Sequence, residues 1–221
     1  MMGRRMVENP GEQLRRLSVE LAAMSQTGLA FATDRYDLSR YTRLRGISAE
    51  ILGLLADQPA EPITAALELD SGYATPHVDV RGAFFNGDKV LLVREASDGC
   101  WTLPGGWADP LDRPRAAIER EFAEEAGLAV QATRLAAVWD GMVSNGHRVG
   151  GHAFHIWKLA YLCEPIDPDA TPQAGLDGET TDVDFFDLDT LPELSSRRTT
   201  EAQLRALRDR HRDADLPPYS D

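Results

Sequence analysis

The sequence predicts an α+β fold in which a small helical amino-terminal domain precedes a larger domain rich in strands. Apolar residues recur every three or four positions in the amino-terminal part of the chain, which is typical of amphipathic helices. From His77 onward, short apolar runs and a hairpin-type turn indicate strands. These strands surround one internal helical segment, 115–126, and this favours an α+β sandwich over repeated βαβ units. We assign 1–70 to the helical domain with its linker and 71–221 to the main domain.

Two amphipathic helices are predicted in the first domain. The first carries the stripe Leu14, Leu17, Leu21 and Met24, and we expect Gly28 to end it. The second carries a stripe that comprises Tyr41, Leu44, Ile47 or Ser48, Ile51 and Leu55. Two helices alone cannot bury both stripes, so we expect them to pack on the main domain or on a second subunit. Segment 57–76 contains three prolines and is predicted to be a linker.

The main domain is predicted to begin with two strands, 78–85 and 89–95, joined by the hairpin signal Asn86-Gly87-Asp88. The internal helix enters through Pro114 and ends at Gly127. Further strands are expected at 135–141, 152–164 and 183–191, and a last helix at 199–212.

Charge and cysteine content limit the possible partners and compartments. The net charge of −13 disfavours binding to nucleic acid polymers and to anionic membranes. Residues 1–10 lack the apolar run of a secretory signal, and no segment reaches the roughly 20 apolar residues of a membrane span. We therefore expect a cytoplasmic protein in which Cys100 and Cys163 are buried free thiols, with a disulfide between them as the less favoured alternative.

Three acids on the internal helix raise the question of a metal site. Glu121, Glu124 and Glu125 stand at positions i, i+3 and i+4, so they share one helix face. Such a cluster is either a solvated acidic face or a set of ligands for a hard divalent cation. The preceding Gly105-Gly106 lets the backbone approach closely, so that its carbonyl groups can complete a coordination shell.

The whole segment resembles the Nudix box, G-x5-E-x7-R-E-U-x-E-E-x-G-U, where U is a bulky apolar residue. Gly106, the run Arg120-Glu121-Phe122-Ala123-Glu124-Glu125, Gly127 and Leu128 match it at the required spacing. Asp112 stands where the family has glutamate. In the family this acid pairs with the box arginine, here Arg120, and the shorter side chain puts that pairing in question.

The resemblance implies an α/β/α sandwich with a mixed sheet and a reaction, the hydrolysis of a nucleoside diphosphate linked to another group X. It implies Mg²⁺ or Mn²⁺ held by Glu121, Glu124 and Glu125. The general base is on the Nudix helix in some members and on a later loop in others. Here that loop offers Glu179 and Asp182 as base or metal ligand, and each is equally well read as an ordinary loop acid.

Nearly the whole chain resembles a bacterial Nudix subgroup with a helical amino-terminal extension. This subgroup includes ADP-ribose and CDP-choline pyrophosphatases, and it implies homodimers to which the extension contributes. The expected substrate is a small nucleotide, with ADP-ribose cleaved to AMP and ribose 5-phosphate, and CDP-choline is the alternative. Candidate substrate contacts are Arg81, Arg94, Trp107, His147 and Arg148.

The sequence disfavours two other classes of function. A non-catalytic Nudix-fold binding module is favoured only by Asp112, because the Glu121, Glu124 and Glu125 set is intact. A polynucleotide hydrolase needs a basic groove, which the acidic composition disfavours.

Overall fold

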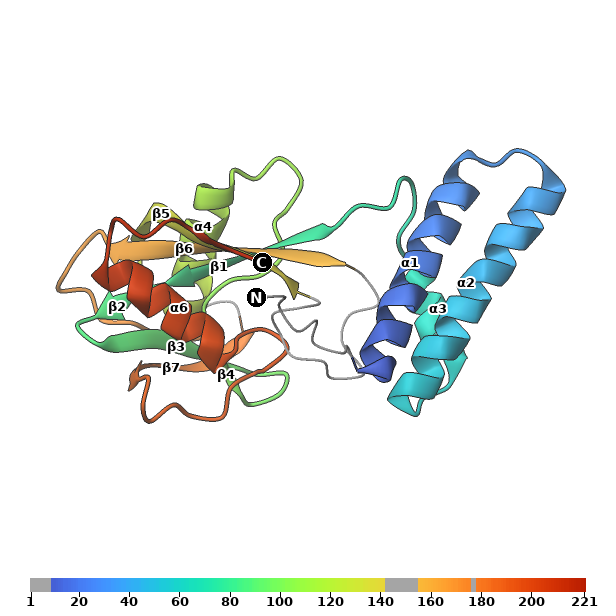
Figure 1. Cartoon of the computed structure of the whole chain (residues 1–221). Helices are drawn as coiled ribbons and strands as arrows, with labels where there is room; N and C mark the ends of the chain where they lie inside the picture. Colours follow the sequence, from blue (N-terminus) through green and yellow to red (C-terminus); the bar gives the residue numbers. More distant parts are fainter. Residues whose placement is uncertain (1–8, 142–154, 176–177) are drawn as a thin grey trace, which may run out of the picture. The chain divides into compact units, whose positions relative to one another are not determined.

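The computed structural model describes residues 9–141, 155–175 and 178–221, and these fall into two compact units that meet in sequence at Pro76 and His77. The first unit is helical, and the second contains the strands (Figure 1). Within the described residues, no helix is both long enough and apolar enough to cross a membrane.

The helical unit consists of α1 (Pro10–Phe31), α2 (Arg35–Ala56) and α3 (Ala60–Glu68). The Asp34 carboxylate caps α2 by accepting from the backbone N–H groups of Tyr36 and Asp37. The α1–α2 contact is built from small residues: the Ser25 hydroxyl donates to the Tyr41 carbonyl, and the Ser48 hydroxyl donates to the Ser18 carbonyl, both at 2.7 Å.

Two predictions for this unit are wrong. Gly28 does not end α1, which continues to Phe31; instead it lets the Tyr41 ring lie against the helix, since a Cβ there would be 2.4 Å from that ring. The predicted linker contains α3, because Pro62 lies in the first turn, where a backbone N–H has no partner within the helix.

The second unit contains two four-stranded sheets, a mixed one in the order β1-β6-β5-β8 and an antiparallel one in which β2, β4 and β7 all pair with β3. Strands β1 and β6 are parallel, β5 and β6 antiparallel. The strands are β1 His77–Ala83, β2 Phe85–Asn86, β3 Lys89–Glu95, β4 Trp101–Thr102, β5 Val130–Asp140, β6 Ile156–Pro165, β7 Thr180–Asp187 and β8 Tyr219–Ser220.

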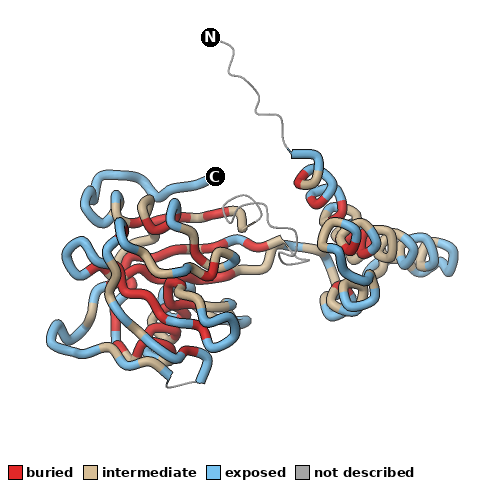
Figure 2. Tube along the Cα trace, turned by 90° about the horizontal axis from the view of Figure 1, so that it is seen from below, coloured by how far each residue is buried: buried red, intermediate tan, exposed pale blue. Residues whose placement is uncertain are grey.

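Two helices, α4 (Pro114–Ala126) and α6 (Glu201–Arg212), each pack into a separate apolar core. Along β3, Val90 and Leu92 belong to the core that α6 covers, whereas Leu91 and Val93 belong to the core that α4 covers. Because side chains alternate along a strand, the two helices lie on opposite faces of the β3 layer. The result is the expected α/β/α sandwich, and its buried residues follow the strands (Figure 2).

The thiols only partly match the expectation. Both cysteines are free, and Cys163 is buried, but Cys100 is partly exposed because it lies in the turn between β3 and β4.

Candidate active site

Helix α4 presents its apolar face to the core and its acids to a loop. Ile118 and Phe122 are buried in the α4 core, and Gly82 of β1 lets them approach, since a Cβ there would be 2.3 Å from the Phe122 ring. Gly127 ends the helix with a φ of 62°, as predicted. This packing fixes Glu121 and Glu125 at the edge of the core, where both are buried.

The Gly105-Gly106 segment lies directly between β1 and the acids of α4. Its backbone is bonded to β1, because the Val80 N–H donates to the Gly106 carbonyl at 2.8 Å. Gly105 has a φ of 137°, and a Cβ there would be 2.0 Å from the Val80 carbonyl oxygen, so only glycine fits. Its N–H donates to the Glu125 carboxylate at 2.9 Å, and a Cβ on Gly106 would be 3.3 Å from Glu121 Oε2.

Burial disfavours the negative charge of Glu121 and Glu125, the two acids at the edge of the core. Burial raises the pKa of Glu125 to about 8, and repulsion from Glu121 and Glu95 adds to the effect of burial against the opposing charge of Arg81. Burial also raises the pKa of Glu121, with Arg120 opposing the shift and Glu124 reinforcing it. Glu121 and Glu125 therefore both lie where an additional positive charge would stabilise the ionised carboxylate.

Arg120 holds the outer part of the acid cluster. Its guanidinium lies 2.9 Å from the Glu124 carboxylate and 3.0 Å from that of Glu121. It also lies 3.2 Å from the Asp112 carboxylate. The shorter aspartate side chain therefore still pairs with the arginine of the Nudix box. The Asp112 carboxylate accepts in addition from the Asp109 N–H at 3.2 Å, which closes the loop before α4.

The chemistry of these ligands fits a hard divalent cation, although the side chains are not arranged around one. All the available donors are carboxylate and carbonyl oxygens, which Mg²⁺ and Mn²⁺ prefer. Over the described ranges, no three His, Cys, Asp or Glu side chains form a ready-made metal cluster. Glu121 and Glu124 are instead directed at Arg120, so holding a cation requires these two side chains to turn from Arg120 toward it.

The two loop acids occupy different environments. The Glu179 carbonyl accepts from the Ala96 N–H at 2.8 Å, and the Glu179 charge acts on both Glu121 and Glu95. Asp182 lies opposite Arg94 in the β3–β7 register, with a half-exposed side chain 3.4 Å from that arginine. Glu179 is therefore the loop acid that the fold brings to α4.

Thr180 ties the Glu179 loop to the acid helix. Its hydroxyl donates to the Glu125 backbone carbonyl at 2.8 Å and accepts from the Gly175 N–H at 3.1 Å. Thr180 and Glu125 are both buried, so the Glu125 carbonyl has no water as a substitute partner, whereas Gly175 is exposed.

The candidate substrate contacts separate into buried and exposed groups. Arg81 is buried and forms a bidentate ion pair with Asp79 at 2.7 and 2.8 Å, and this geometry does not support a direct contact with the diphosphate. Arg94 and Trp107 are exposed and remain accessible to a ligand. His147 and Arg148 lie outside the described residues.

Three charged residues beneath the site were not predicted. Glu95 is buried, 3.1 Å from Arg198, and burial raises its pKa. Asp79 holds Arg81, and the buried Lys158 ammonium donates to the Arg198 carbonyl at 2.6 Å. Alternation along β3 could have identified Glu95, because it shares a strand face with Leu91 and Val93; no sequence pattern indicates the other two.

Comparison with known proteins identifies two family regions. Residues 12–67 match the model of a UDP-X-like, N-terminal oligomerisation domain, and residues 75–208 match the NUDIX domain. The chain is 38% identical over 195 residues to YjhB of Bacillus subtilis, which is provisionally named an ADP-ribose pyrophosphatase. The match covers 87% of this chain and 90% of that protein.

Solved structures agree with this assignment. A UDP-X diphosphatase covers 96% of this chain and 99% of its own at 30% identity, with a TM-score of 0.59. An ADP-ribose pyrophosphatase from Streptococcus suis covers 66% of this chain and all of its own at 35% identity, with a TM-score of 0.58. The chain belongs to the Nudix family and is a Nudix pyrophosphohydrolase.

Proposed function

We propose that this enzyme uses a divalent cation, Mg²⁺ or Mn²⁺, to hydrolyse the diphosphate of ADP-ribose, releasing AMP and ribose 5-phosphate. The observation that carries the proposal is the position of Glu121 and Glu125, buried on α4 against the Gly105-Gly106 backbone. These two acids, Glu124 and the Gly105 and Gly106 carbonyls are the groups proposed to hold the metal. Bound there, the metal would neutralise the diphosphate and lower the pKa of the attacking water.

Glu179 is the proposed general base. The Ala96 N–H fixes its backbone and the Thr180 hydroxyl fixes the adjoining residue to α4, so its position relative to Glu121 is maintained by two hydrogen bonds. In hydrolysis, the water oxygen bonds to phosphorus, its proton passes to the carboxylate, and the bridging P–O bond breaks toward the leaving phosphate. Asp182, which is paired with Arg94, is assigned no part in this step.

Relatives rather than geometry support the choice of substrate. Both YjhB and the Streptococcus suis protein carry the name ADP-ribose pyrophosphatase, whereas the structure that covers 96% of this chain is named UDP-X diphosphatase. Arg94 and Trp107 are the exposed cationic and aromatic residues proposed to contact the substrate. CDP-choline and UDP-linked compounds are the alternatives.

A product assay tests the proposal. The enzyme is incubated with ADP-ribose, CDP-choline or a UDP-sugar, with Mg²⁺ and separately with Mn²⁺, and the products are separated by ion-pair chromatography. AMP formed from ADP-ribose in preference to the other two reactions is the expected result. Metal binding without turnover of any substrate would contradict the catalytic proposal, and preferential release of CMP or UMP would replace the substrate. Mn²⁺ titration followed by electron paramagnetic resonance measures the metal site independently of turnover.

We further propose a cytoplasmic homodimer held together through the helical unit. The match of residues 12–67 to an oligomerisation domain supports the assembly, and the free thiols of Cys100 and Cys163 are consistent with a reducing compartment.

A further inference from the structure

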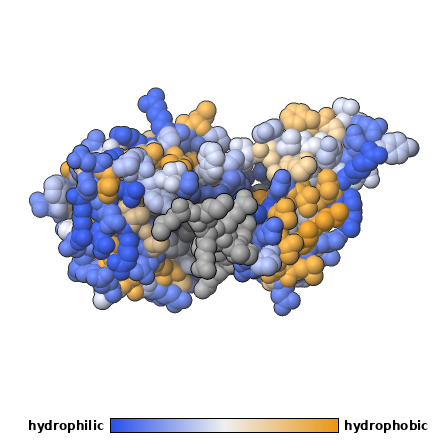
Figure 3. Space-filling model, viewed as in Figure 1, coloured by the Kyte–Doolittle hydropathy of each residue, from blue (hydrophilic) through white to orange (hydrophobic). Residues whose placement is uncertain are grey.

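The residues before α6 bring charge into the strand-rich unit as well as to its surface. Figure 3 shows that the face of this unit that carries α6 is largely hydrophilic. Arg198, three residues before α6, is instead directed at the buried Glu95 at the end of β3, with Nε 3.1 Å from the carboxylate. The Lys158 ammonium donates to the carbonyls of Arg197 at 3.0 Å and Arg198 at 2.6 Å. Arg198 is thus held by its backbone as well as by its ion pair.

The Arg198 guanidinium also binds the turn that follows Glu95 between β3 and β4. Its Nη1 lies 3.2 Å from the Asp98 carboxylate, and its Nη2 donates to the Ser97 hydroxyl at 3.3 Å. One side chain from the segment before α6 therefore contacts three of the four residues 95–98. The position of this turn depends on Arg198.

The same turn holds the backbone of the proposed base. The Ala96 N–H donates to the Glu179 carbonyl at 2.8 Å, so Glu95 is adjacent in sequence to the residue that fixes Glu179. The charge of Glu179 acts on Glu95, and the charge of Glu95 acts on Glu125 of α4. Acids that the backbone brings together in this way repel one another unless a cation compensates the charge.

We infer that Arg198 is a positioning residue for the hydrolysis: it neutralises Glu95 and so keeps the turn that holds the Glu179 backbone next to α4. The inference rests on the proposed role of Glu179 as general base and adds a residue outside the Nudix box that holds this base in place. Without the Arg198 charge, the buried Glu95 carboxylate lacks its counter-ion. It then repels Glu179, and the base is displaced from α4.

Removal of the Arg198 charge should lower kcat and leave KM nearly unchanged. Arg198→Gln should lower kcat by about 100-fold, the cost of displacing a catalytic group by about 1 Å. Arg198→Lys should restore part of the rate, because it keeps the charge but not the planar fork of donors. The constants are measured with Mg²⁺ and ADP-ribose, or with the assayed nucleotide that the enzyme hydrolyses fastest. Mn²⁺ affinity, measured by electron paramagnetic resonance, should stay close to that of the wild type.

A second substitution distinguishes neutralisation of Glu95 from a merely structural role. If Arg198 acts through the charge of Glu95, Glu95→Gln should rescue Arg198→Gln, and the double variant should approach the kcat of Glu95→Gln alone. A structural role predicts instead that the losses of the two single variants add. The double variant carries no charge at position 95, so it tests the inference even if Arg198→Gln does not fold.

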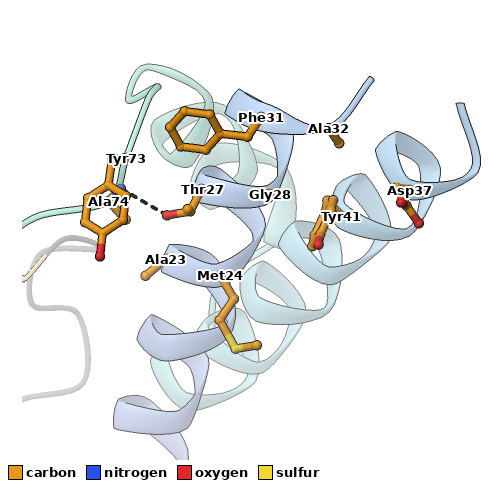
Figure 4. Close-up of a pocket in the computed structure, with 10 residues that line it drawn as sticks. All are labelled: Ala23, Met24, Thr27, Gly28, Phe31, Ala32, Asp37, Tyr41, Tyr73 and Ala74. Carbon is orange, nitrogen blue, oxygen red and sulfur yellow. Dashed lines mark hydrogen bonds between the residues drawn. The ribbon is translucent and has the colours of Figure 1, made fainter. Parts of the chain in front are cut away.

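Two controls lose comparable contacts away from the proposed base. Arg205→Gln removes a guanidinium on α6 that lies 2.8 Å from the Glu201 carboxylate and 3.2 Å from that of Asp189. Thr27→Val removes the hydroxyl that accepts from the Ala74 N–H at 3.1 Å and ties a loop to α1 (Figure 4). Both variants should keep the wild-type kcat. Circular dichroism and melting verify that every variant is folded.

The outcomes separate the inference from the proposed function. Wild-type kcat in Glu179→Gln contradicts the general base, and the inference fails with it. If Glu179→Gln is impaired, wild-type kcat in Arg198→Gln contradicts the inference alone, as do additive losses in the double variant. Loss of Mn²⁺ binding in Arg198→Gln would show that Arg198 supports the metal ligands and not the base, which also overturns the inference.

Discussion

At the scale of single residues, Glu125 is a buried carboxylate whose charge the fold tolerates poorly in the absence of a cation. Its pKa is raised from 4.5 to about 8 by burial. A raised carboxyl pKa means that the folded protein holds a proton that the unfolded chain has lost between these values, so folding becomes less favourable as the pH rises through this range.

Glu125→Gln should remove this pH dependence. The amide is neutral at every pH and can still accept from the Gly105 N–H, so the melting temperature of the variant minus that of the wild type should grow as pH rises from about 5 to about 8 in chelator. Glu124→Gln, at a half-exposed position, is the control and should show no such growth. Melting curves that shift in parallel for both variants would contradict the burial argument.

Thr180 is predicted to act as a positioning residue for Glu179. Thr180→Val keeps the shape but loses the hydrogen bond to the Glu125 carbonyl, and a resulting displacement of the base of about 1 Å would lower kcat by about 100-fold with little change in KM. Thr180→Ser should restore most of the rate. Val90→Ala, a core truncation outside the α4 core, is the control for lost stability alone. Equal kcat in the Val and Ser variants would contradict the positioning role.

Much of the site can be predicted from sequence, because the spacing of the acids on one helix is a local property. Glu121, Glu124 and Glu125 share a face for that reason, and Gly105 is glycine for a conformational reason that a Gly-Gly pair indicates. The ion pair between Arg81 and Asp79 could not be predicted, because the burial of a strand residue depends on which elements later cover it.

At the scale of elements, the loop before α4 contains a strained residue. Leu111 has a φ of 76°, in the left-handed region, and its side chain is fully exposed. The contacts of Asp112 with Arg120 and with the Asp109 N–H hold the backbone in this turn. Because the Leu111 side chain is exposed, no burial of apolar surface offsets the cost of its left-handed conformation.

Leu111→Gly should raise the free energy of unfolding. Relief of the left-handed conformation is worth about 1–2 kcal/mol, and the added flexibility of glycine in the unfolded chain offsets part of it, so a net gain of about 0.5–1 kcal/mol is expected. Leu111→Ala, which keeps the strain, should leave stability within about 0.5 kcal/mol of the wild type. Chemical denaturation measures both, and an equal effect of Gly and Ala would show that the backbone strain is negligible.

Elements with an apolar period or with Pro and Gly at their ends can be predicted from the sequence. Elements that exist only because a neighbouring strand pairs with them cannot. Helix α4 has a Pro at its start and a Gly at its end, and the hairpin of β2 and β3 turns at Gly87-Asp88, within the predicted Asn-Gly-Asp signal. The two-residue strands β4 and β8 exist only because β3 and β5 lie beside them. Helix α3 is not predicted from the sequence, because Pro59 and Pro62 indicate a helix break. They are compatible with a helix only because Pro59 is its N-cap residue and Pro62 lies in its first turn.

At the scale of the whole molecule, the division into two compact units predicts where the chain can be shortened. Within the helical unit, Leu67 of α3 packs with Ala22 of α1 and Ala49 of α2. A cut between α2 and α3 therefore exposes an apolar face, whereas a cut at the junction of the units does not divide any core.

Two deletions of different length should accordingly behave in opposite ways. Removal of residues 1–56 leaves α3 without the helices that bury Leu67, so this chain should aggregate or populate large species in light scattering. Removal of residues 1–75 takes away α1, α2 and α3 together and should give a monomer that melts cooperatively. If the shorter deletion instead yields a well-behaved dimer, assembly does not depend on α1 or α2, and the homodimer contact must be sought in residues 57–221.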